Sequence, residues 1–189
     1  MADLTTNDTL AVIGRRRSVR SYTAIQTTDD DLDAVVEAGM YAPSAGGQAW
    51  HFTVVQNKKL LAELNAAAKA VAKHAGGFLA TLAADETYDC LHGAPTLIVV
   101  SGDEQSPSPQ VDCAAATENM LIAAESLGLG ACWLFFVTLA FGSPRAAELR
   151  QALEIPGGYR PYAAAVFGCK RGDAADAPPR KANVVSYIR

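Results

Sequence analysis

The sequence lacks the long apolar runs that membrane spans need. Half of its 189 residues are apolar, yet no uninterrupted apolar stretch reaches the roughly 18 residues expected of a transmembrane helix. The first ten residues, MADLTTNDTL, are polar and acidic and show none of the basic-then-apolar character of a secretion signal. We therefore expect no membrane partner.

Cysteine pairs and metal-ligand spacings are missing as well. The histidines, three in number, are too scattered to form a metal-ligand motif, so no metal site is expected. The cysteines lie mostly in apolar surroundings and are predicted to be buried free thiols in a reducing compartment, which favours the cytoplasm. They are widely separated and form no CxxC pair: Cys90, Cys113, Cys132 and Cys169.

Signatures of the common nucleotide-binding and hydrolase sites are absent too. There is no GxGxxG after a strand, no GxxxxGK[ST] and no GxSxG elbow, and no local Cys–His pair stands out. The acidic residues are scattered, so no carboxylate pair can be chosen for acid–base catalysis. An enzyme whose difficult chemistry is done by a cofactor has this kind of sequence, with binding residues and few catalytic side chains.

Net positive charge is also lacking. The formal net charge is −4 and the pI is near 5.3, which argues against a nucleic-acid partner. The basic residues are unevenly distributed, however, because four of the sixteen fall between Arg15 and Arg20. Such a cluster in an acidic protein suggests a small anionic ligand. The length fits a single domain over residues 1–189, with a C-terminal arm at about 176–189.

Helix and strand signals alternate without a strict βαβ order. Helices are predicted over 8–17, 29–42, 58–73, 111–127 and 143–153, and strands or extended segments over 50–56, 94–102, 128–136, 161–169 and 184–188. Residues 62–84 are Ala-rich and weakly patterned, so neither the end of the third helix nor the structure of the residues after it is well defined. The pattern predicts an α+β fold with one sheet between helices.

The helix predicted over 111–127 is apolar or small on nearly every side. Its charged residues are Asp112, Glu118 and Glu125. A helix of this kind is buried on most faces, either as a central core helix or at a subunit interface.

Three short stretches are suited to a ligand site. In RRRSVRSY, the guanidinium groups could bind phosphate oxygens bidentately with help from a serine hydroxyl, although a solvated basic helix end has the same composition. In APSAGGQAWHF, small residues would let the backbone approach a ligand, but turns favour them too. In LGLGACWLFF, the glycines could simply end a helix and the aromatic residues could be core.

Taken in order, these stretches resemble the nitroreductase family of FMN-dependent oxidoreductases. GAPTLIVV, DCAAATENMLIAAESLGLGACW and the basic tail PPRK also match, so the resemblance covers nearly the whole chain. It implies an α+β fold with a central mixed, mainly antiparallel sheet flanked by helices. It also implies a homodimer with interlocked termini and FMN bound at the subunit interface.

The resemblance further implies a role for each matching residue. Arg20 is expected near the flavin N1/C2 carbonyl, where a cation stabilises the negative charge that develops on reduction. The phosphate and ribityl contacts are expected from the same turn and from the tail: Arg16, Arg17, Ser18, and Arg180 or Lys181. The segment along the flavin face, with backbone N–H groups near N5 and O4, is expected to be Leu134, Phe135 and Phe136.

The small-residue loop is expected to come from the other subunit and to line the edge of the isoalloxazine ring through Pro43, Ser44, Ala45 and Gly47. A looser match places Asn65 and Lys69 opposite the pyrimidine ring. This loop departs from the family, which often has Asn where Gly47 stands and Pro where Ala49 stands. The loop is also one residue shorter. These departures bear on substrate choice more than on FMN binding.

The activity implied is a ping-pong reaction in which NADH or NADPH passes hydride to flavin N5 and a small aromatic acceptor, such as a nitroaromatic or a quinone, then takes the electrons. Arg20 tunes the flavin, and no catalytic side chain is expected. Other interpretations are a flavin-handling or FMN-binding protein without NAD(P)H turnover, a relative with a dehydrogenase or dehalogenase role, and a structural dimer whose basic turn is merely solvated. Segment 74–93 carries no substrate information.

Overall fold

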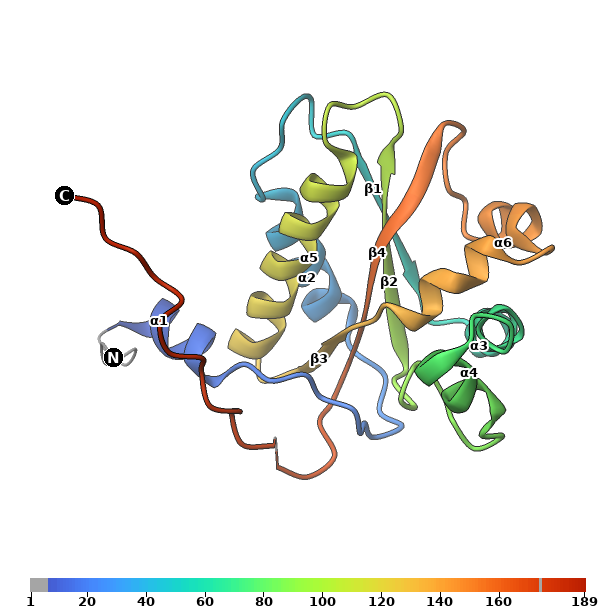
Figure 1. Ribbon diagram of the computed structural model, residues 1–189, viewed down its shortest axis with the longest axis horizontal. Helices are drawn as coiled ribbons and strands as arrows, with labels where there is room; N and C mark the ends of the chain where they lie inside the picture. Colours follow the sequence, from blue (N-terminus) through green and yellow to red (C-terminus); the bar gives the residue numbers. More distant parts are fainter. Residues whose placement is uncertain (1–6, 174) are drawn as a thin grey trace.

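A four-stranded sheet with the strand order β1-β2-β4-β3 forms the centre of the computed structural model, which describes residues 7–173 and 175–189 (Figure 1). Every neighbouring pair of these strands is antiparallel, and a parallel bridge joins Ser18 to Ala131 at the β3 edge. The strands are β1 (Trp50–Val55), β2 (Thr96–Asp103), β3 (Gly130–Trp133) and β4 (Tyr159–Gly168). The predicted α+β class and mainly antiparallel sheet are confirmed.

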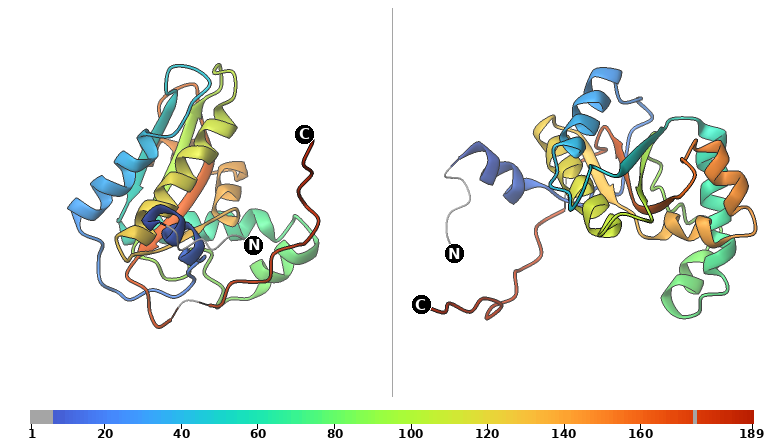
Figure 2. Two further views of the ribbon diagram at one scale, coloured as in Figure 1. Left: turned by 90° about the vertical axis from the view of Figure 1, so that its left-hand side faces the viewer. Right: turned by 90° about the horizontal axis from the view of Figure 1, so that it is seen from above.

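Helices cover both faces of the sheet (Figures 1 and 2). On one face lie α2 and α5, and on the other lie α3, α4, α6 and the 3₁₀ helix η1. The helices are α1 (Asp8–Arg15), α2 (Asp29–Met40), α3 (Lys58–Ala72), α4 (Gly77–Ala84), α5 (Pro109–Ser126), η1 (Phe136–Gly142) and α6 (Ala146–Ala152). Successive residues of β2 alternate between the two layers, with Leu97 in the core beside α3 and Ile98 in the core beside α5.

The predicted burial of α5 is confirmed. Met120 and Leu121 are buried in the layer beside α2, and two acidic residues near the ends of the helix, Asp112 and Glu125, are buried as well. Gly39 of α2 faces Met120, and a Cβ at this glycine would lie 2.9 Å from the Met120 side chain. The glycine therefore lets α2 approach α5 closely.

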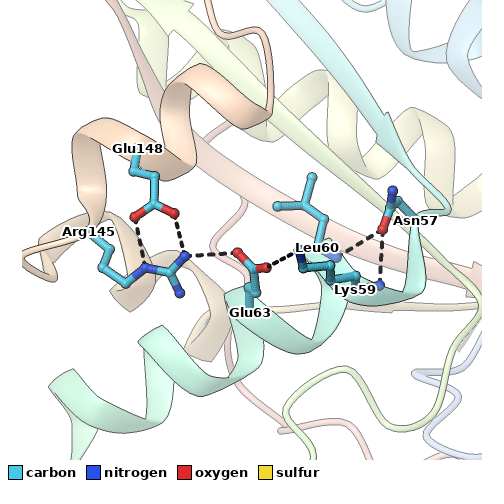
Figure 3. Close-up of polar contacts among 6 residues, drawn as sticks. All are labelled: Asn57, Lys59, Leu60, Glu63, Arg145 and Glu148. Atoms are coloured by element: carbon cyan, nitrogen blue, oxygen red, sulfur yellow. Dashed lines mark hydrogen bonds and ion pairs between the residues drawn. The ribbon is translucent and has the colours of Figure 1, made fainter.

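Side-chain caps and ion pairs fix the outer helices. The Asn57 carboxamide accepts hydrogen bonds from the Lys59 and Leu60 N–H groups at the start of α3, at 3.0 and 3.1 Å. Arg145, which precedes α6, donates to Glu63 of α3 at 2.8 Å and also binds Glu148 of α6 (Figure 3). These ion pairs are solvent-exposed and add little stability, but they join α3 to α6.

Three segments differ from the sequence prediction. The weakly patterned region contains a separate helix, α4, which was not predicted. The extended segment after β3 is shorter than predicted, because Phe136 begins η1 and its buried side chain packs under the sheet. Among the described residues, the tail at 184–188 forms no strand. It runs away from the sheet as an extended arm with Ile188 98% exposed (Figure 1).

Candidate functional site

The arginine-rich turn leaves α1 and runs along the edge of β3. The Val19 N–H donates to the Ala131 carbonyl at 2.9 Å, and Tyr22 forms a bridge to Lys170 at the end of β4. The buried Tyr22 hydroxyl donates back to the Val19 carbonyl at 2.7 Å, and burial raises its pKa, so this group stays neutral. The sheet thus holds the turn in one conformation.

The guanidinium groups of this turn differ in their partners. Arg16 lies 3.5 Å from Glu118 of α5. Arg17 donates to the carbonyls of Gly14 and Arg16, and Arg20 donates to the Ser18 carbonyl at 3.3 Å. Within residues 7–173 and 175–189, neither Arg17 nor Arg20 has an ion pair with a carboxylate. Their charges are therefore available to an anion.

A buried carboxylate compensates the basic residues on the other side of the turn. Glu125, whose side chain is only 7% exposed, accepts from Arg15 Nε at 2.9 Å and from Lys170 Nζ at 2.8 Å. Burial alone would raise the pKa of Glu125, but the hydrogen bonds from these two cations outweigh it and the pKa is lowered. This pairing ties α1 and the end of β4 to α5.

The predicted phosphate-binding residues lie around two adjoining cavities of about 260 and 290 Å³. Both are lined by Arg17, Ser18 and Arg20. The tail closes the larger one, since Arg180 lies in its wall together with Arg16. The structure thus brings these five residues together from opposite ends of the chain, whereas Lys181 lines neither cavity.

Arg20 also borders a third cavity, of about 400 Å³, with apolar walls. The segment predicted to follow the flavin face supplies one wall, in which Leu134 and Phe136 are buried and Phe135 is 66% exposed. Phe78 of α4, which is 75% exposed, also lines this cavity. A cation therefore lies where cation-lined cavities meet an aromatic one.

The segment between α4 and β2 also lines the apolar cavity, through Tyr88, Cys90 and His92. The Tyr88 ring packs edge-on against Phe136 with 5.2 Å between centroids. Burial raises the pKa of the Cys90 thiol to about 12, and burial, followed by the charge of Arg20, lowers the pKa of His92. Near neutral pH these cavity groups are uncharged.

Asn65 and Lys69 of α3 bind the backbone of this segment. The Lys69 ammonium donates to the carbonyls of Asp85 and Tyr88 at 2.7 and 2.9 Å. The Asn65 carboxamide oxygen accepts from the Cys90 N–H at 3.1 Å. Their polar groups are thus engaged by the backbone of the loop, and the predicted contacts of both residues with the flavin ring stay predictions.

The small-residue loop lies at the far end of α5 from the arginine turn (Figure 1). Its backbone turns tightly at Gly47, where φ is +70°, a conformation that favours glycine. The Ala45 N–H donates to both carboxylate oxygens of Asp112, at 3.1 and 3.2 Å, and the Ser108 hydroxyl donates to the same group. This buried carboxylate fixes the loop to the start of α5.

The structure therefore separates two groups of predicted site residues within one chain. Asp112, beside the loop, and Glu125, beside the arginine turn, are 13 residues apart on one helix, about 20 Å along its axis at 1.5 Å per residue. Pro43, Ser44, Ala45 and Gly47 lie at one end of α5, and the cavities bordered by Arg20 lie at the other.

Several residues of the site were not identified from the sequence. Tyr88 and His92 lie in a segment without a recognisable pattern, and nothing in the sequence places Phe78 beside the arginine turn. Asp112 gave a usable signal, because an isolated carboxylate in the first turn of an otherwise apolar helix needs a specific partner.

The part of the chain that the structure describes contains no group of three or more His, Cys, Asp or Glu side chains able to hold a metal ion. None of its helices combines the length and the apolar character needed to cross a bilayer.

The sequence matches the model of the Nitroreductase family over residues 13–169. Among curated proteins, it is 29% identical over 193 residues to the Bacillus subtilis protein named "FMN reductase [NAD(P)H]", and the match covers 96% of this chain and 73% of that protein.

Solved structures with bound FMN share the whole fold. The crystal structure of a nitroreductase from Bacteroides fragilis with bound FMN has a TM-score of 0.90 and 37% identity, over 97% of this chain and all of that one. A nitroreductase from Desulfitobacterium hafniense with bound FMN has a TM-score of 0.88 and 30% identity, over 97% of this chain and 100% of that chain.

Proposed function

The chain belongs to the nitroreductase family, and from this premise we propose that it is an FMN-dependent oxidoreductase that passes electrons from NAD(P)H to a small aromatic acceptor such as a nitroaromatic or a quinone. One observation carries the proposal for this chain. Arg20 stands between cation-lined cavities and an aromatic-lined cavity, which is the arrangement that a flat ring with an anionic tail requires.

The residues present fit FMN. Clustered guanidinium groups and a serine hydroxyl suit a phosphate, so we assign the phosphate end to Arg16, Arg17, Ser18 and Arg180 or Lys181. The aromatic cavity suits the ring, with Leu134, Phe135 and Phe136 along one face. The Leu134 N–H already donates to the Ala164 carbonyl at 2.8 Å, so polar contacts with the ring fall to the N–H groups of Phe135 and Phe136.

Bound FMN supplies the hydride chemistry that links the oxidation of NAD(P)H to the reduction of the acceptor. The protein contributes position and electrostatics. Arg20 stabilises negative charge at the carbonyl end of the ring. The apolar walls exclude water. Because Tyr88 and His92 are uncharged, the cavity suits flat neutral molecules.

The site is proposed to be completed by a second copy of the chain. Two α5 helices packed antiparallel about a two-fold axis would bring the loop of each subunit to the arginine turn of the other. Exposed apolar residues on α1 and the tail support such a dimer, since Ile13, Val184 and Val185 lie on the surface of one chain. In this arrangement Pro43, Ser44, Ala45 and Gly47 line the ring edge in the partner's site.

Removal and return of the cofactor tests the activity. Purified protein is stripped of FMN, assayed for NADH- and NADPH-dependent reduction of a quinone and of a nitroaromatic, and assayed again after FMN is added. Turnover should vanish and return with FMN. If FMN binds tightly and neither nucleotide supports turnover, the protein handles flavin without catalysing this reaction.

Mixed dimers test the shared site. One subunit carries Arg17→Ala and the other Asp112→Ala, which weakens the anchor of the loop. If the loop serves the partner's site, the mixed dimer has one doubly impaired site and one intact site, and about half of the wild-type activity returns. If the loop serves its own subunit, both sites stay impaired and no activity returns.

A further inference from the structure

A further cavity, of about 480 Å³, lies between η1, α6 and the start of β4. It meets the apolar cavity at Phe135, which lines both. Its polar lining includes two arginines, one acidic residue and two further donors: Arg150, Arg160, Glu104, Gln110 and Tyr162. Apart from Phe135, none of the residues predicted to contact FMN and none of the loop 42–49 lines this cavity.

Arg150 lines this cavity, and its guanidinium group includes a donor without a partner in the described part of the chain. Its Nε is buried and has no hydrogen-bond partner among the described residues. A buried donor without a partner is rare and costly. Arg145, at the start of the same helix, differs in this respect, because its guanidinium binds both Glu63 and Glu148.

Arg160 supplies a second cation. Its guanidinium carbon lies 5.8 Å from the centre of the Tyr162 ring, a cation–π distance, and across the described ranges it forms no ion pair with a carboxylate. With Glu104 as the one acidic residue in the lining, the side chains of this cavity carry a net charge of +1, from two arginines less one glutamate.

We infer that this cavity is an anion subsite for ligands that enter the site bordered by Phe135, and that it binds a phosphate or carboxylate group carried by such a ligand. The inference rests on the proposed function, since it assigns one part of a ligand whose flat ring occupies the neighbouring apolar cavity. Guanidinium groups bind both anions well. Two sources have this chemistry, namely the 2′-phosphate of NADPH and a carboxylate on the aromatic acceptor.

The test uses FMN-loaded protein in which Arg150→Gln or Arg160→Gln removes one cation. The control is Lys73→Gln, which removes one positive charge from the exposed end of α3 and lines none of these cavities. Two variants are used because the Arg150 side chain is partly buried and its loss could affect folding, whereas Arg160 is exposed.

One arm measures the apparent Kd of NADPH and of NADH from anaerobic flavin reduction. The other measures the apparent Kd of 4-nitrobenzoate and of the uncharged 4-nitroacetophenone from the reoxidation of dithionite-reduced protein. Loss of a charge-assisted hydrogen bond should weaken the binding of the more anionic ligand of one pair, either NADPH or 4-nitrobenzoate. Its affinity should fall by roughly tenfold or more relative to that of the other ligand in the pair. A selective loss for NADPH identifies the nucleotide phosphate, and a selective loss for 4-nitrobenzoate identifies an acidic acceptor.

The inference is overturned if two affinity ratios, NADPH to NADH and 4-nitrobenzoate to 4-nitroacetophenone, stay within about twofold of the wild-type values in both arginine variants. In the control variant both ratios should stay within this range. Failure of the proposed function gives a different result. In that case neither nucleotide reduces the wild-type flavin, while the acceptor arm, which uses dithionite, still reports on the anion subsite.

Discussion

Replacing Asp112 by alanine should release the loop 42–49 from the start of α5. Asp112 is 5% exposed, and its carboxylate accepts hydrogen bonds from the Ala45 N–H and the Ser108 hydroxyl. It is also the acidic residue in the first turn of α5. The substitution therefore removes a loop anchor and a favourable helix-end charge at once.

The expected loss of stability follows from these contacts. Hydrogen bonds to a charged group contribute about 1.5–3 kcal/mol each, and a carboxylate in the first helical turn adds about 0.3–1 kcal/mol. Ala45 is exposed, so water can replace the lost acceptor and the lower part of the range applies. We expect the free energy of unfolding to fall by about 3 kcal/mol. FMN affinity should fall about tenfold, since the partner's loop must then be ordered on binding.

Urea unfolding at fixed protein concentration and FMN fluorescence titration measure the two effects. Asp112→Asn retains an acceptor oxygen and should lose less of each. Asp31→Ala, which removes a carboxylate at the start of α2, should leave FMN affinity unchanged. If Asp112→Ala loses stability but binds FMN as the wild type does, the loop does not contact the cofactor. If stability is also unchanged, the assigned hydrogen bonds contribute nothing.

Three other predictions can be tested separately. Arg20→Ala should lower the reduction potential of bound FMN, because a cation near the ring stabilises the reduced form, and equal potentials in a dye-coupled titration would contradict this role. The lowered pKa of Glu125 contributes stability that is present above its unfolded pKa and is lost as pH falls through the folded value. Glu125→Gln should therefore be less stable than the wild type at pH 7, and the difference should shrink on acidification in urea unfolding. Burial raises the pKa of Cys90 and Cys113 to about 12, so native protein at mildly alkaline pH should be alkylated first at the half-buried Cys169, and mass spectrometry showing the opposite order would refute the assigned burial.

Local patterns predicted most of the fold. The strands over 50–56, 94–102 and 161–169 and the helix over 111–127 have compositions and periods that depend on near neighbours, and all are present within a few residues. The helix α4 was not predicted, because its alanine-rich sequence has little amphipathic character. The strand suggested at 184–188 is absent from the described residues, because strand composition alone does not supply a pairing partner.

The candidate site was predicted in parts. The arginine turn and the tail residue Arg180 do come together around shared cavities, a placement that follows from the family resemblance rather than from spacing. Tyr88 and Arg150 could not be predicted, since their roles depend on contacts between distant segments. The contact of the Lys69 ammonium with the Tyr88 carbonyl also joins distant segments and could not be predicted from local sequence.

Anaerobic reduction of the FMN-loaded protein by NADH and by NADPH is the decisive experiment for the proposed activity. We expect that at least one nucleotide bleaches the visible flavin absorbance and that an added quinone or nitroaromatic restores it. A protein that binds FMN stoichiometrically, is reduced by dithionite, and is bleached by neither nucleotide would contradict the proposed electron transfer from NAD(P)H.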